Sequence, residues 1–152
     1  MGRRAHESGM LYDEVEEPGE TSPERLREEY TAELRAVVDA RGVDAVADES
    51  GVDRKTVAAL AAGEDPGPIQ LSDAAAILAT DPDAPASEDI LLETRDHLLM
   101  GMTTAVLDVD TLAAELDADL DAKQVQQKVE GRSPMTLDEY ARLQHFIASR
   151  QR

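Results

Sequence analysis

Cysteine and tryptophan are absent from this chain of 152 residues, which has one phenylalanine and only three lysines, Lys55, Lys123 and Lys128. The lack of cysteine excludes disulfide frameworks and thiolate zinc sites, and it suits a reducing cytosol. No apolar run approaches the ~20 residues of a membrane helix, and the N-terminal residues lack the apolar core of a signal peptide. We therefore expect a cytoplasmic protein without a membrane partner.

Charge is the strongest compositional signal. The 33 acidic residues outnumber the 15 lysines and arginines and leave a net charge of −18. At low ionic strength these charges repel one another strongly, whereas salt at molar concentration screens them within roughly 3 Å. A densely acidic, hydrated surface predicts a halophilic source, and the acidity then reflects the environment rather than a partner.

Glycine, proline and apolar residues divide the chain into four segments. Residues 1–20 are acidic and contain too few apolar residues to order themselves, so we expect a disordered tail in which Met10 is an alternative start to Met1. Residues 21–80 and 87–152 carry apolar residues at helical spacing and form the two predicted units. The proline-rich residues 81–86 lie between them as a linker.

A long helix is predicted at the start of each unit. Ser22 and Pro23 favour the start of the first. Apolar residues then recur every three or four positions, at Leu26, Tyr30, Leu34, Val37 and Val38. The second helix, from Ile90 to Met102, is the most apolar part of the chain. We expect it in the core or at a dimer interface.

An internal repeat organises the rest of the sequence. Residues 43–49 align with residues 109–115, and later matches pair Val57 with Val125, Gly63 with Gly131, Leu71 with Leu137 and Ile77 with Leu143. The offset is 66 residues at the start, 68 after a two-residue insertion in the second turn, and 66 at the end. The predicted fold is all-α, a tandem repeat of helix-turn-helix-like four-helix units. A chance alignment of alanine-rich helices is the alternative.

The first copy carries the pattern of two helices that cross at a tight turn. A small residue, Ala47, falls where the helices cross, and Gly51 falls where the turn needs a left-handed backbone. Asp53 is placed to cap the second helix and Gly63 to end it. Over about residues 30–80, this pattern resembles the DNA-binding unit of phage-repressor-like proteins of the Cro/C1 type.

The resemblance implies that the second helix of the unit faces the major groove of DNA. In the first copy Arg54 and Lys55 can reach phosphates, whereas the alanines at 58, 59 and 62 cannot read base edges. The second copy has Asp117 in place of the turn glycine, and its helix is more polar. Its candidate phosphate contacts are Lys123, Lys128 and Arg132, and its candidate base contacts are Gln124 and Gln127. A merely solvated polar helix is the alternative.

No catalytic, metal or cofactor site is predicted. Asp117, Asp119 and Asp121 alternate as at the start of a calcium-binding loop, but Ala122 replaces the required glycine and Lys128 the closing glutamate. The three histidines have no partner at metal-ligand or triad spacing. Phosphate-binding and nucleophile motifs are also absent from the sequence. We therefore expect a protein that is not an enzyme and needs no cofactor.

The segment from Met10 to Glu20, together with the first repeat, resembles an uncharacterised haloarchaeal family, a domain of unknown function. That resemblance implies a cytoplasmic location and no assigned activity. The leading hypothesis from the sequence is a DNA-binding or transcription-associated protein that forms a homodimer, or binds a protein partner, through the helix from Ile90 to Met102. The alternative is a protein-protein interaction module whose helix-turn-helix units have lost contact with DNA.

Overall fold

The structure is a computed structural model that describes residues 22–115 and 120–150. Within these residues it contains eight helices and no β-strand, which confirms the all-α prediction. They are α2 (Pro23–Arg41), α3 (Val43–Ser50), α4 (Arg54–Ala62), α5 (Leu71–Leu78), α6 (Ser87–Ala105), α7 (Val109–Glu115), α8 (Ala122–Val129) and α9 (Leu137–Arg150). The predicted tail, and Asp117 and Asp119 of the second turn, lie outside the described residues. The division of the chain into units stays a prediction.

Helix α2 begins at the predicted position. The Ser22 hydroxyl oxygen accepts a hydrogen bond from the Arg25 N–H at 3.1 Å, Pro23 is the first helical residue, and Gly42 ends the helix with φ 95°. The predicted apolar face is confirmed, because it is the buried face: Leu26, Tyr30, Leu34, Val37 and Val38. This face forms one wall of the hydrophobic core.

Helices α3 and α4 meet at a three-residue turn. Gly51 adopts the left-handed conformation there, with φ 77°, and the Asp53 carboxylate accepts a hydrogen bond from the Lys55 N–H at 3.1 Å. Gly63, also with φ 77°, ends α4. The predicted turn, cap and stop are thus confirmed, since each depends on backbone geometry that local residue types select.

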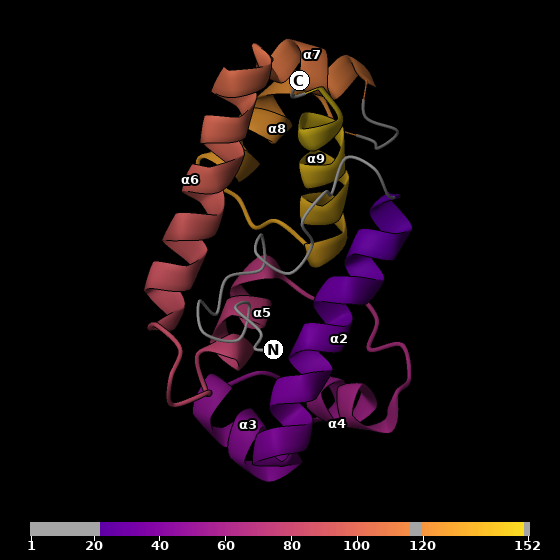
Figure 1. The fold of residues 1–152 in the computed structure, drawn as a ribbon, viewed down its shortest axis with the longest axis vertical. Helices are drawn as coiled ribbons and strands as arrows, with labels where there is room; N and C mark the ends of the chain where they lie inside the picture. The colour runs from indigo at the N-terminus through magenta and orange to yellow at the C-terminus, as the bar shows by residue number, and fades with distance from the viewer. Residues whose placement is uncertain (1–21, 116–119, 151–152) are drawn as a thin grey trace, which may run out of the picture.

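The first four and last four helices interlock (Figure 1). Helix α2 packs along α9, and α5 packs along α6, so the last helix of each set lies against the first helix of the other. The Tyr30 and Tyr140 rings meet between α2 and α9, with centroids 5.4 Å apart and planes tilted by 41°. A single apolar core therefore runs through both sets of helices.

The loops that precede α5 and α9 pair with each other through their backbones. Leu71 N–H donates to the Met135 carbonyl, and Leu137 N–H donates to the Ile69 carbonyl, both at 2.7 Å. The pairing is antiparallel and centred on Gln70 and Thr136, which are 66 positions apart. This separation equals the predicted offset of the final segment of the repeat, although the repeat itself stays a prediction.

Helix α6 is amphipathic rather than uniformly apolar. Ile90, Leu98 and Met102 are buried on its inner side, against α5 and α9. Charged residues occupy much of its outer side, from Glu88 to Asp96. Neither α6 nor any other helix in the described part of the chain combines the length and the hydropathy needed to span a bilayer.

Candidate functional site

The exposed side of α4 has basic residues only in its first turn. Arg54 and Lys55 are exposed there, and further along the helix the exposed side chains are Ala58 and Ala62. The Arg54 guanidinium forms an ion pair with Asp44 of α3. The face predicted to meet DNA therefore offers one neutralised arginine, one lysine and a stretch of small apolar side chains.

On α8 the first predicted base contact already has a structural role. Gln124 and Asp121 form a reciprocal capping box: the Asp121 carboxylate accepts the Gln124 N–H at 2.8 Å, and the Gln124 amide oxygen accepts the Asp121 N–H at 2.9 Å. An acidic residue followed three positions later by glutamine is the sequence signal for this motif. Reading a base with that amide oxygen would require Gln124 to release the cap. Lys123, beside it, is exposed.

Lys128 and Arg132 are both paired with acidic neighbours. The Lys128 ammonium donates to Glu139 at 3.0 Å and to the Pro134 carbonyl at 2.7 Å, and its side chain is only 15% exposed. Arg132 forms an ion pair with Glu130 at 2.6 Å. This hydrogen bond, with a smaller contribution from Gln126, lowers the pKa of the Glu130 carboxyl below its ordinary value.

The seven predicted contacts do not form one surface. Helices α3 and α4 lie at one end of the molecule, and α7 and α8 at the other (Figure 1). Gln127 is half-buried, and its backbone carbonyl accepts the Arg132 N–H at 2.8 Å. Lys55 and Lys123 are the predicted cations that form no ion pair within the described ranges, and they sit on different helices.

The outer face of α6 is the most exposed apolar surface in the described part of the chain. Its large apolar side chains are Leu92, 52% exposed, Leu99, 38%, Met100, 68%, and the capping residue Val106, 88%. At 100° per residue, Leu92, Leu99 and Met100 fall on one side of the helix. The doublets Leu91-Leu92 and Leu98-Leu99 could have served as the sequence signal, because neighbouring helical positions point about 100° apart and a doublet therefore widens the apolar surface beyond one narrow stripe.

Val106 ends α6 in a conformation that valine rarely adopts. Its φ of 57° and ψ of 50° place it in the left-handed region, where it is the one non-glycine residue with positive φ in the described ranges. A β-branched side chain crowds the backbone there, and a side chain that is 88% exposed gains little packing in return. Strain of this kind motivates a functional hypothesis.

We expect Val106→Gly to raise the free energy of unfolding by about 1 kcal/mol, because glycine adopts the left-handed conformation without a steric cost. Urea denaturation followed by circular dichroism measures the change. Val106→Ala removes the exposed side chain but keeps a Cβ, so its stability should fall between those of the other two proteins. A Val106→Gly protein no more stable than the parent would contradict the strain.

Carboxylates surround the apolar stripe on α6. Glu88, Asp89, Glu93 and Asp96 are all exposed on this helix. Its arginine, Arg95, is half-buried and lies against Gly131 in the loop after α8. The outer face of α6 is therefore both apolar and acidic, and we call it the α6 face: Leu92, Leu99, Met100 and Val106 with these four carboxylates.

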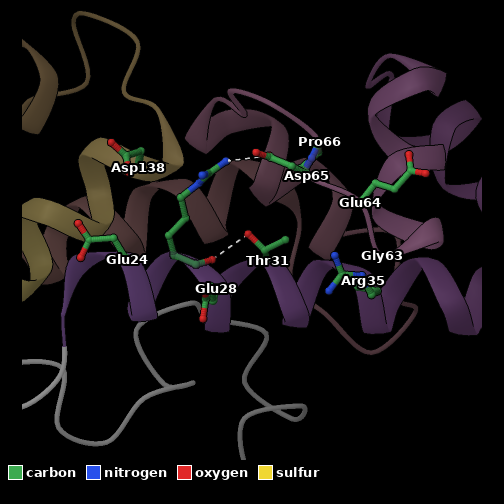
Figure 2. Close-up of a pocket in the computed structure, with 10 residues that line it drawn as sticks. Glu24, Glu28, Thr31, Arg35, Gly63, Glu64, Asp65, Pro66 and Asp138 are labelled. Carbon is green, nitrogen blue, oxygen red and sulfur yellow. Dashed lines mark hydrogen bonds and ion pairs between the residues drawn. The ribbon is translucent and has the colours of Figure 1, made fainter.

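The largest pocket described, about 550 Å³, opens between α2, the loop after α4 and the start of α9 (Figure 2). Glu24, Asp65 and Asp138 reach it from three different segments. Its two arginines tie α2 to the loop and to the end of α4: Arg27 donates to the Gly67 carbonyl at 3.1 Å and Arg35 to the Leu60 carbonyl at 2.6 Å. Among the described residues, no histidine or serine lines this pocket. Its geometry supports loop attachment rather than chemistry.

The described residues contain no group of three histidine, aspartate or glutamate side chains arranged to hold a metal ion.

Comparison with known proteins adds a family assignment. No curated protein and no solved structure matches the chain significantly. A family of unknown function, DUF5791, matches residues 26–150, a span that includes α3 to α9 and nearly all of α2. The chain therefore belongs to this family of unknown function, DUF5791.

Proposed function

We propose that this protein is a non-enzymatic interaction module that binds another protein through the α6 face. The carrying observation is that the exposed large apolar side chains of the described residues all belong to α6 or its cap, and one of them, Val106, has a strained backbone. Exposed apolar groups that lie together mark interaction surfaces more often than isolated ones do. The strained backbone of Val106 costs folding free energy, and strain of this kind at an exposed apolar surface supports a role in binding.

Charge decides which partner fits. The carboxylates of Glu88, Glu93 and Asp96 would approach their own copies if two α6 faces packed together, and like charges brought together across an interface weaken it. A partner with an apolar stripe flanked by lysine or arginine would instead meet opposite charges. We therefore propose a partner protein of that chemistry rather than a homodimer.

The test compares two double variants of the full-length protein. Leu99→Glu with Met100→Glu places two carboxylates in the centre of the α6 face, and Ala58→Glu with Ala62→Glu adds the same charge to the exposed side of α4. Affinity capture identifies a partner, and calorimetry with the purified partner measures binding. We expect the α6 variant to bind about 100-fold or more weakly, and the α4 variant to bind like the parent, because a few central apolar groups carry most interface energy.

Three outcomes would reject the proposal. The first is equal binding by parent and α6 variant, and the second is a partner whose contact site, mapped by cross-linking, lacks basic residues. The third is a concentration-dependent dimer in light scattering that the α6 variant abolishes, which would assign the face to a second copy. Circular dichroism of each variant verifies that the helices remain folded.

DNA binding in a transcription-associated role is the second candidate function. The observation that favours it is the α3–turn–α4 geometry, in which Gly51 forms the turn and an exposed α4 begins with Arg54 and Lys55. Fluorescence anisotropy with genomic fragments in molar KCl tests it, using Lys55→Glu with Lys123→Glu as the variant. Saturable binding that this variant weakens would support DNA binding, and no binding above that of an equally acidic control protein would reject it.

Cytoplasmic location and a halophilic source complete the proposal. They are supported by the net charge of −18 and the absence of cysteine. A protein adapted to salt should become more stable as KCl rises to molar concentration, and a melting temperature that does not increase would argue against this origin.

A further inference from the structure

A second pocket, of about 250 Å³, lies between α6, the loop from α8 to α9 and the first turn of α5. Three basic side chains line it: Arg95, Lys128 and Arg132. Leu71, Leu91 and Met135 supply its apolar lining. No aspartate or glutamate of the described residues lines it, in contrast to the larger, acid-rich pocket. In a chain with net charge −18, it is unexpected that the charged residues lining a cavity are all cations, although Glu139 and Glu130 pair with two of them.

Arg95 is the least satisfied of these cations. Arg95 is half-buried, and its guanidinium lies so close to Gly131 that a methyl group on that glycine would come within 2.7 Å of the Arg95 Cζ atom. Within the described ranges Arg95 forms neither an ion pair nor a hydrogen bond. Removing a charged group from water without giving it a partner is costly, and the cost falls when an anion binds.

The two other cations retain donors after their internal contacts are counted. The Lys128 ammonium has three N–H groups, of which Glu139 and the Pro134 carbonyl take two. Arg132 has five and uses its Nε and Nη2 atoms to hold Glu130, which leaves Nη1 free of any contact with the described residues. Arg95 of α6 therefore lines the same pocket as Lys128 and Arg132, which come from the end of α8 and the loop after it and each keep an unused N–H group.

We propose that this pocket binds the phosphate group of a small phosphate monoester. Phosphate offers several oxygens and up to two negative charges, and guanidinium groups bind such oxygens through paired hydrogen bonds. A cavity of about 250 Å³ has room for a phosphate group that carries a short hydrocarbon chain. The hydrocarbon part of the ester would contact the apolar lining.

This site is independent of the α6 face. Arg95 packs inward against the loop at Gly131, whereas Met100 and Leu99 are exposed on the outer face of the helix. The two proposals can fail separately, because one depends on cations in the pocket and the other on apolar residues outside it.

Titration of the ¹⁵N-labelled full-length protein with glycerol 3-phosphate, and separately with inorganic phosphate, tests the proposal at constant KCl. We expect saturable chemical-shift changes at the amides of Gly131 and Ser133, and tighter binding of the ester than of inorganic phosphate. Arg95→Met should weaken ester binding at least tenfold, because it keeps an unbranched apolar stem but removes the charged fork of donors. Arg95→Lys, which keeps only the charge, should fall between Arg95→Met and the parent.

Arg25→Met is the matched control. Arg25 is an exposed α2 arginine paired with Glu29 at 3.1 Å, and its replacement changes the net charge equally. We expect it to leave ester affinity within twofold. The proposal is overturned if no saturable shift occurs at the pocket, if the two arginine-to-methionine variants weaken binding equally, or if inorganic phosphate binds as tightly as the ester. Displacement of the ester by a short DNA duplex would also overturn it, by assigning the pocket to a nucleic-acid backbone.

Discussion

Tyr140→Ala should lower the free energy of unfolding by about 3–5 kcal/mol, the cost typical of deleting a large aromatic side chain from a core. Tyr140 is fully buried on α9, and its ring lies 5.4 Å from that of Tyr30 on α2. Removing it opens a cavity where the first and last described helices meet. Because this contact joins the two interlocked sets of helices, the whole domain should lose stability together.

Urea denaturation measures this effect, with helix content and tyrosine fluorescence as separate probes. Tyr140→Phe keeps the ring and should retain most of the stability that Tyr140→Ala loses. A loss below about 1 kcal/mol for Tyr140→Ala would show that the site collapses around the deletion. Two separate transitions would show that the sets of helices unfold independently.

Glu139→Ala should cost about 2–4 kcal/mol, because this carboxylate accepts hydrogen bonds from two groups at once. Glu139 accepts the Thr136 N–H at 2.9 Å, while its own N–H donates to the Thr136 hydroxyl at 3.0 Å, so the pair forms a capping box at the start of α9. It also accepts from Lys128 at 3.0 Å, and the two side chains are only 15% and 21% exposed. Its removal leaves a largely buried ammonium without its anion.

A double-mutant cycle with Lys128→Met isolates the ion pair. The cost of Glu139→Ala should be smaller in the Lys128→Met background, because the ammonium is no longer stranded there. Equal costs in the two backgrounds would show that the ion pair contributes nothing and that the cap carries the whole effect. Lys123→Met on the exposed side of α8 is the control and should change stability by less than about 0.5 kcal/mol.

This cycle also separates two roles of Lys128. As a phosphate contact, Lys128 would affect DNA affinity more than stability. As the partner of Glu139, it stabilises the junction of α8, the following loop and α9. Measuring stability and DNA binding on the same variant shows which role dominates.

The locally coded parts of the fold were predictable from the sequence. The start of α2 at Ser22 and Pro23, the left-handed turn at Gly51 and the end of α4 at Gly63 all follow from residue types acting on their own backbone or on neighbours within a few positions. The buried face of α2 followed from helical periodicity for the same reason. Side-chain burial along one helix repeats with the period of the backbone.

The candidate sites were less predictable, because each depends on residues far apart in the chain. The sequence marked Lys128 as an accessible cation, but its partner Glu139 lies eleven positions further on and reaches it only after α9 packs. No motif in the sequence includes Arg95. Its position is unusual only because the fold places its guanidinium against Gly131. In both cases the surroundings of a charged side chain depend on tertiary packing, and helical periodicity does not predict which distant residues will contact it.

Helix α6 combines features that the local sequence predicts with features that depend on distant parts of the chain. The sequence by itself predicted an apolar helix from Ile90 to Met102 that lies in the core or at a dimer interface, because its apolar residues are dense. Only the tertiary structure decided that Ile90, Leu98 and Met102 fill the core while Leu92, Leu99 and Met100 remain outside. The physical reason is that α5 and α9 cover a single side of α6, and their positions depend on contacts between distant parts of the chain.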